Sequence, residues 1–358
     1  MDDSEVVTRL LQCLASAFDR PDLGYAEAPT RISGGRDAAI FGFALQGAPP
    51  ALSGQLILRL NRSRVGEDRV RLETIVHNWL AARQYACPDV RATGTDPSVL
   101  GGVFTVMTRL AGRPLADEIE RIGGEEGLIA RARGLLRAWT ILAGVIDAWV
   151  DAQIRLHALE PAPLLAAVGT GGLDPATITF DGQLRSIIAT VEQFSLVALK
   201  PAVDWLNTCR PSAALPAVIC HGDFHPLNIL AQNGKVTGVI DWVNIVVAPA
   251  EMDVGSAIAN IATAPFGAPR ALQFALRIVI TRILLRYQRT YARRRALDSD
   301  AVRYFQVFRC VHQLTAVLRG RAAGGHQSGT FDSAVGVNNL VRHIREISGV
   351  TVTVEGID

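Results

Sequence analysis

The chain changes its hydrophobic pattern at Gly112, and this change constrains the fold more than any other feature. From Thr30 to Leu110, short apolar runs alternate with turn residues, which is the pattern of β-strands. Beyond Gly112, apolar residues recur mainly at the 3.6-residue spacing of helices. A single hydrophobic core stops growing at roughly 250 to 300 residues, and this chain has 358. The sequence therefore predicts an α+β protein of two lobes: residues 1–109 form an antiparallel sheet lobe, and residues 110–358 form a larger, mainly helical lobe.

The first lobe is expected to contain two helices. Residues 5–18 place apolar side chains close to one helical face, and Pro21 ends this leading helix. Residues 69–85 show the same spacing, and they lie between the strand-like runs 54–60 and 103–107. A further strand is expected at residues 39–46. The pattern predicts a sheet with one inserted helix.

The second lobe is expected to contain five helices and one small hairpin. The helices span residues 125–159, 178–206, 250–262, 270–294 and 301–322. Residues 217–241 differ, because three short apolar runs occur there. Two of these runs flank Asn233 and Gly234, a pair that readily adopts positive φ in a tight turn. A β-hairpin is therefore expected within the helical lobe.

Composition excludes several classes of protein. With 49% apolar and 20% charged residues, the chain is globular in type. The five cysteines are scattered without a CxxC pair, which favours neither a disulfide framework nor a zinc site. The most apolar stretch, residues 135–156, contains four charged residues and predicts a buried helix rather than a membrane span. The N-terminus lacks the pattern of a signal peptide, so we expect a cytoplasmic protein without a membrane partner.

Polar residues typical of phosphoryl transfer lie within the segment from His221 to Asp241. Asp223 and Asn228 are five residues apart (228 − 223), and Asp241 follows thirteen residues later (241 − 228), at the end of a hairpin strand. Mg²⁺ prefers oxygen ligands, and a bound triphosphate supplies the rest of its shell. We expect Asn228 and Asp241 to bind Mg²⁺ and Asp223 to accept the proton of an attacking hydroxyl.

The motifs His221-Gly222-Asp223, Asn228 and Ile240-Asp241-Trp242 together resemble the aminoglycoside phosphotransferase and choline kinase family. The resemblance implies a bilobal protein-kinase-like fold and a kinase that transfers the γ-phosphate of ATP to an alcohol group of a small molecule. His221 is a candidate catalytic residue because it lies beside Asp223. In the resembled family, however, this histidine mainly braces the loop through backbone hydrogen bonds. Asp253 matches a family aspartate that holds the same loop in shape.

The resemblance identifies the first lobe as the nucleotide-binding lobe. Arg59 interrupts an apolar strand at the point where the family has a cation that contacts the α and β phosphates. Glu73, fourteen residues later (73 − 59), stands where a family glutamate pairs with that cation. Gly34 and Gly35 resemble the family's phosphate-covering turn, and a plain hairpin turn is an equal interpretation of this pair.

Residues 106–112 resemble the family's hinge between the lobes. Met107 is expected at the back of the adenine pocket, and the backbone of Arg109 and Leu110 is expected to meet the edge of the base. Backbone groups distinguish purines poorly, so GTP is a possible donor beside ATP.

The charge of the C-terminal part bears on the acceptor. Residues 242–358 carry fourteen arginines and eight acidic residues, a balance of +6 (14 − 8). Polycationic acceptors are normally held by clustered carboxylates. We therefore expect a neutral or partly apolar small-molecule acceptor with a hydroxyl group. Arg293 to Arg295 are compatible with an anion-binding patch, but also with a helix end that complements the dipole, and we expect no nucleic-acid partner.

A second hypothesis is a catalytically weak nucleotide-binding protein of the same fold that acts through partners. The complete set Asp223, Asn228 and Asp241 favours an active kinase, because a protein without turnover has no chemical need for all three. The pattern does not predict an oligomeric state.

Overall fold

The computed structural model describes residues 2–32, 38–61, 66–117, 128–212, 215–265, 270–324 and 331–354. The chain divides into two compact units. The first comprises Met1–Gly112, Ala166–Leu173 and Thr237–Ile240, and the second comprises Arg113–Leu165, Asp174–Val236 and Asp241–Asp358. The predicted fold class, an antiparallel sheet followed by a mainly helical part, is confirmed.

A five-stranded antiparallel sheet forms the centre of the first unit, in the order β1-β2-β3-β5-β4. Its strands are β1 (Gly24–Ile32), β2 (Ala39–Gln46), β3 (Gln55–Asn61), β4 (Val90–Gly94) and β5 (Val103–Thr108). The expected runs at 39–46, 54–60 and 103–107 correspond to β2, β3 and β5 within one residue at each end. Strands β1 and β4 lie at the two edges of the sheet.

Helix α1 (Asp3–Ala17) packs on one face of this sheet. The side chain of Asp2 caps it by accepting a hydrogen bond of 2.8 Å from the main-chain N–H of Glu5. Val6, Leu10 and Leu14 recur at helical spacing and are fully buried against aromatic and leucine side chains of β2 and β3. Each buried leucine contributes about 2 kcal/mol of stability, so the apolar stripe fixes α1 on the sheet.

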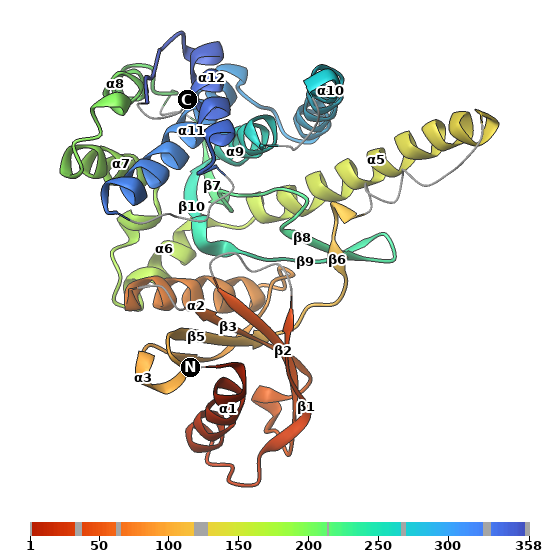
Figure 1. The fold of residues 1–358 in the computed structure, drawn as a ribbon, viewed down its shortest axis with the longest axis vertical. Coiled ribbons are helices and arrows are strands. Elements are labelled where there is room, and N and C mark those ends of the chain that lie inside the picture. The colour runs from red at the N-terminus through yellow and green to blue at the C-terminus, as the bar shows by residue number, and fades with distance from the viewer. Residues whose placement is uncertain are drawn as a thin grey trace. The chain divides into compact units, whose positions relative to one another are not determined.

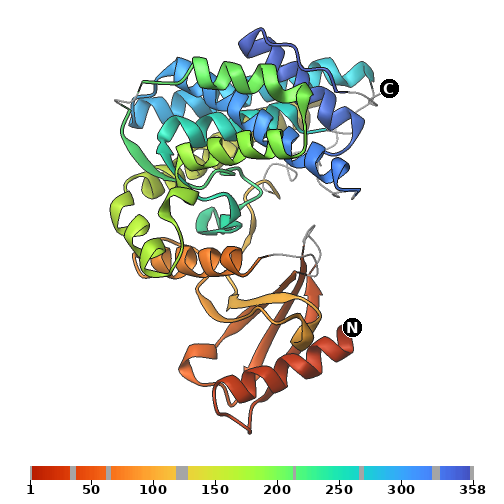
Figure 2. The ribbon, with the colours of Figure 1, turned by 90° about the vertical axis from the view of Figure 1, so that its left-hand side faces the viewer.

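Helix α2 (Glu67–Ala81) lies on the other side of the sheet from α1, as Figures 1 and 2 show. Successive side chains of a strand point to opposite faces. Leu58 and Leu60 of β3 are buried in the core that α1 covers, so Arg59 between them points to the face of α2. A short helix, α3 (Pro97–Leu100), precedes β5.

The second unit is mainly helical. Its elements are β6 (Arg113–Pro114), α5 (Leu128–His157), α6 (Pro161–Thr170, whose end belongs to the first unit), α7 (Phe180–Gln193), α8 (Lys200–Thr208), β7 (Ala217–Cys220), β8 (Ile229–Gln232), β9 (Lys235–Val239, which runs into the first unit), β10 (Val246–Pro249), α9 (Ala250–Thr263), α10 (Arg270–Arg294), α11 (Ser299–Ala322) and α12 (Ala334–Ser348). Figure 2 shows these helices stacked in layers.

Helix α9 lies at the centre of the second unit, because twelve of its fourteen residues are buried. It packs closely against α11, where Gly255 makes the approach possible. A Cβ atom at Gly255 would lie 2.7 Å from the main-chain oxygen of Val302. Helices α9 and α11, which both contribute residues to the candidate site, are therefore held with their backbones close together.

The expected hairpin is present as β8 and β9. Asn233 and Gly234 form its turn with φ of 51° and 74°, which confirms the positive φ predicted from this pair. The preceding strand, β7, pairs instead with β10 in an antiparallel ladder that joins Cys220 to Val246.

The predicted helix 178–206 is wrong as one element, because it is divided into α7 and α8. Pro201 stands in the first turn of α8, and a proline inside a continuous helix would remove a hydrogen bond and clash with the preceding turn. Ser195 adopts a φ of 50° between the two helices, which is incompatible with helical continuation. Helices α6 and α12 were not predicted. Among the described helices, none has the length and apolar character needed to cross a membrane.

Candidate active site

In the first unit, the predicted cation, Arg59, and the predicted carboxylate, Glu73, lie in contact. Arg59 of β3 forms a hydrogen-bonded ion pair with Glu73 of α2, which is 7% exposed. The pairing follows from strand alternation, which directs Arg59 to the face that α2 covers. Glu73 is buried, and its ion pair with the guanidinium supplies the partner that a buried carboxylate requires. The contact of Arg59 with nucleotide phosphates stays a prediction.

The predicted hinge residues follow β5. The side chain of Met107 is buried in the sheet, and the main-chain N–H of Arg109 donates to the carbonyl of Gln55 at 2.9 Å. That N–H is therefore engaged by the sheet. The expected contact of the Arg109 and Leu110 backbone with a base stays a prediction. Leu110 packs close to Gly238, where an added Cβ would lie 2.2 Å from its Cδ1 atom. Gly34 and Gly35 lie outside the described residues.

In the second unit, the loop between β7 and β8 carries His221, Asp223 and Asn228. Gly222 adopts a φ of 77°, and a Cβ there would lie 2.1 Å from the main-chain oxygen of Asn244. Only glycine combines this conformation with this approach. The tight turn at Gly222 directs the N–H groups of His221 and Gly222 to the carboxylate of Asp253, at 2.9 and 2.6 Å.

The ring of His221 is fully buried. Its Nδ1 atom accepts a hydrogen bond of 3.2 Å from the main-chain N–H of Asp223. The ring packs against Phe224 and Trp242, with centroids 5.5 and 4.6 Å away. These contacts are those of a residue that braces the loop, and its candidacy as a catalytic residue stays a prediction.

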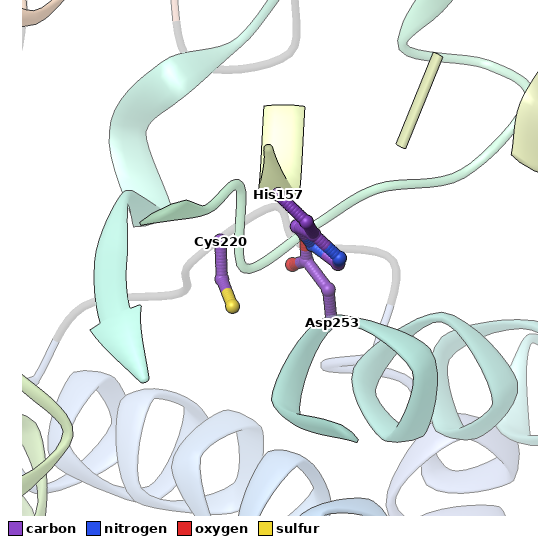
Figure 3. A group of neighbouring side chains, drawn as sticks. All are labelled: His157, Cys220 and Asp253. Carbon is purple, nitrogen blue, oxygen red and sulfur yellow. The ribbon is translucent and has the colours of Figure 1, made fainter. Parts of the chain in front are cut away.

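Asp253 also belongs to a buried group with His157 and Cys220 (Figure 3). One nitrogen, sulfur or oxygen atom of each side chain lies within 4.8 Å of those of the other two. His157 Nε2 lies 3.0 Å from Asp253, and its Nδ1 lies 2.6 Å from the hydroxyl of Tyr291. Burial and the nearby Asp253 carboxylate raise the pKa of the Cys220 thiol well above its ordinary value. Because every ring nitrogen and carboxylate oxygen here has a protein partner and the thiol stays protonated, the group braces the loop rather than binding a metal.

The carboxylate of Asp223 lies at the centre of a polar cluster within the second unit. Its Oδ1 atom accepts a hydrogen bond of 3.1 Å from Nη2 of Arg309 and another from Nδ2 of Asn260. Nε2 of His225 lies 3.3 Å from the same oxygen. Burial alone would raise the pKa of Asp223, but the Arg309 guanidinium and the ring of His225 hold that pKa well below its usual range.

The orientation of each amide in this cluster is determined by its neighbours. An ionised carboxylate only accepts hydrogen bonds, so Asn260 must turn its Nδ2 to Asp223. Its Oδ1 then accepts from Nε of Arg309 at 2.9 Å and from Nε2 of Gln313 at 2.8 Å. Arg309 thus contacts Asp223 both directly and through Asn260. Helices α9 and α11 supply this network.

Asn228 and Asp241 offer the oxygen atoms that Mg²⁺ prefers. Nδ2 of Asn228 donates to the main-chain oxygen of Asp223 at 3.0 Å, which leaves the Asn228 amide oxygen to face away from that bond. Asp241 is exposed and adopts a left-handed conformation with a φ of 68°. A carboxylate and an amide oxygen fit a magnesium ion that also binds phosphate. Both assignments remain predictions.

Sequence reasoning missed Arg309 and Asn260. Asp223 and Arg309 are 86 residues apart, and Asp223 and Asn260 are 37 apart. No local spacing connects such pairs. A polar asparagine on the apolar helix 250–262 was the one available signal for Asn260.

A family model matches most of the chain. The model of the phosphotransferase enzyme family matches residues 30–297, or 268 of 358 residues (297 − 30 + 1). No curated protein sequence matches the chain. Helix α11, which carries Arg309, lies beyond the matched region.

Several solved structures share the fold. One is a thermostable mutant of the aminoglycoside phosphotransferase APH(4)-Ia in a ternary complex with AMP-PNP and hygromycin B, at 17% identity and a TM-score of 0.61, covering 95% of this chain and 99% of that one. A complex of the same enzyme with ADP and hygromycin B gives 17% identity, a TM-score of 0.60 and the same coverage. An aminoglycoside-3'-phosphotransferase of type VIII gives 17% identity and a TM-score of 0.51, covering 83% of this chain and 97% of that one.

Proposed function

The chain belongs to the phosphotransferase enzyme family, and on that premise we propose that it transfers the γ-phosphate of ATP to a hydroxyl group of a small molecule. The observation that carries this proposal is the braced loop of the second unit, which holds Asp223 and Asn228 together through the bond from the Asn228 amide to the Asp223 main chain. The nucleotides in the APH(4)-Ia complexes support a nucleoside triphosphate as donor.

In the proposed reaction, Asp223 orients the acceptor hydroxyl and takes its proton. The hydroxyl oxygen forms a bond to the γ-phosphorus while the bond to the β–γ bridging oxygen breaks, and ADP leaves. The proton is then released to solvent. Asp223 is suited to this step because it is ionised and only partly buried, with 18% of its side chain exposed.

The proposal assigns two further sets of residues. Asn228 and Asp241 would hold Mg²⁺, which when bound neutralises charge on the phosphate oxygens. Arg59, kept in place by Glu73, would contact the phosphates of the nucleotide. ATP is the proposed donor and GTP is a possible second one, since the predicted base contacts are made by backbone groups.

A neutral or partly apolar acceptor is also proposed. Asp223 is paired with the guanidinium of Arg309, so the two charges offset each other at the point where the hydroxyl is expected. A polycationic acceptor would gain little attraction from a carboxylate that already has a cationic partner.

The test is ADP formation by the purified protein with Mg²⁺-ATP over a panel of sugars, macrolides and aminoglycosides, with product mass measured for each compound. We expect one compound to gain the mass of one phosphate in step with ADP. Absence of any phosphorylated product, together with tight AMP-PNP binding, would refute the proposal and favour a nucleotide-binding protein without turnover.

A further inference from the structure

The guanidinium of Arg309 is buried between α9 and α11 and contacts the candidate base of the proposed reaction. Arg309 is 8% exposed, and two of its nitrogen atoms make hydrogen bonds within the cluster, Nη2 to Asp223 and Nε to Asn260. Removal of a cation from water is costly unless it is paired, so this position calls for a carboxylate partner. We propose that Arg309, supported by Asn260 and Gln313, is a positioning residue that fixes the Asp223 carboxylate for phosphoryl transfer.

The geometry leaves one oxygen of Asp223 for the acceptor. Within the part of the chain that the structure describes, the side-chain contacts of Asp223 all converge on Oδ1, from Arg309, Asn260 and His225. A carboxylate held through one oxygen cannot rotate without breaking these bonds. Oδ2 is therefore presented in one direction, which is the condition for an oriented proton acceptor.

The support of Arg309 itself comes from α9 and α11. Asn260 accepts from Nε of Arg309 and donates to Asp223, so it fixes the angle between the two charged groups. Gln313, one helical turn beyond Arg309, donates to the same Asn260 oxygen. The two helices that carry these residues, α9 and α11, pack closely against each other at Gly255. Arg309 thus acts on the reaction through Asp223. This inference rests on the proposed function.

The experiment measures kcat and KM, both for Mg²⁺-ATP and for the acceptor identified in the compound panel, in variants of Arg309. Arg309→Gln removes the charge, and Arg309→Lys keeps the charge but loses the fixed bond to Asn260. The matched control is Arg303→Gln, an exposed arginine six residues earlier (309 − 303) on α11. Thermal unfolding and AMP-PNP binding are measured for each variant to establish that it is folded.

We expect Arg309→Gln to lower kcat about tenfold or more, while KM for ATP and KM for the acceptor change by less than about threefold. Arg309→Lys should recover part of the loss in kcat, and Arg303→Gln should match the wild type. If the wild type turns over but Arg309→Gln keeps the wild-type kcat, this inference alone is overturned. A wild type that forms no ADP with any acceptor refutes the proposed function instead.

If Arg309→Gln is unfolded, Gln313→Leu is compared with the wild type instead. This substitution removes the donor to Asn260 and leaves Arg309 and Asp223 unchanged. A smaller fall in kcat, with KM for ATP unchanged, supports the positioning role. An unchanged kcat in a folded Gln313→Leu protein contradicts it.

Discussion

The main-chain N–H of Gly222 donates a hydrogen bond of 2.6 Å to Oδ1 of Asp253, and this contact holds the loop that carries Asp223. Asp253 is fully buried on α9, and its second oxygen accepts from the neighbouring N–H of His221 at 2.9 Å. A left-handed turn at residue 222 is what brings both N–H groups to one carboxylate.

We expect Gly222→Ala to lower turnover by more than tenfold and to reduce the melting temperature by several degrees. The added Cβ would meet the Asn244 oxygen at 2.1 Å and would also disfavour the φ of 77°. Gly349→Ala is the matched control, since Gly349 has a φ of 74° but no atom within 4 Å of an added Cβ. That control should lose about 1 kcal/mol of stability and keep its activity. Equal effects of the two substitutions on turnover would contradict the account of Gly222.

Asp241→Asn should weaken Mg²⁺-dependent nucleotide binding by a hundredfold or more. Asparagine tolerates the left-handed conformation of this residue, so the substitution removes the charge without changing the backbone. Calorimetry with AMP-PNP, with and without Mg²⁺, gives the metal-dependent part of the affinity. Asp300→Asn, at an exposed position of α11, is the control. A metal dependence equal to that of the wild type would rule out Asp241 as a ligand.

Much of the local structure could be predicted because it depends on neighbours in the sequence. The strand Ala39–Gln46 and the helix Arg270–Arg294 agree to the residue with the expected elements, since local apolar patterns define them. The turn at Asn233 and Gly234 follows from the conformational preferences of those two residues. The spacing of Asp223 and Asn228 could likewise be recognised in the sequence, because both residues lie on one loop.

The rest depends on contacts that no local pattern contains. The pairing of Asp223 with Arg309 arises from the packing of α11 against α9, and an arginine on a helix is most often a solvated surface residue. The break near Pro201 was visible in the sequence, but the apolar spacing of residues 178–206 outweighed it in the prediction. Asn260 also could not be identified from a local pattern, because its role depends on its contact with Asp223.

Kanamycin-like polycations should be poor acceptors, with kcat/KM below roughly 10⁴ M⁻¹s⁻¹ at low salt. The Asp223 charge is offset by Arg309, and residues 242–358 carry a formal balance of +6 (14 − 8), so long-range attraction of a polycation is weak. Steady-state ADP formation, compared with that for neutral sugars and macrolides, provides the measurement. A value above that level for a polycation would show that other carboxylates dominate the acceptor site.

Stability should fall as the pH decreases from about 6.5 towards 4. Burial lowers the pKa of both His312 and His343 to about 4, whereas these rings bind a proton near pH 6.5 in the unfolded chain. The unfolded state therefore binds more protons in this interval, which destabilises the folded state by up to about 1.4 kcal/mol per pH unit for each ring. His343→Gln, which can keep the bond to Gln306, should flatten the dependence measured by urea unfolding at pH 7 and pH 5. An unchanged slope in this variant would show that His343 does not titrate on unfolding.

The central claim is that Asp223 is the proton acceptor of phosphoryl transfer, and a comparison of the wild type with Asp223→Asn under saturating Mg²⁺-ATP tests it most directly. Asparagine fits the same space but cannot take the proton, so kcat should fall by a hundredfold or more while the Kd for AMP-PNP changes by less than about threefold. Formation of the phosphorylated acceptor by Asp223→Asn at a rate near that of the wild type would contradict the claim.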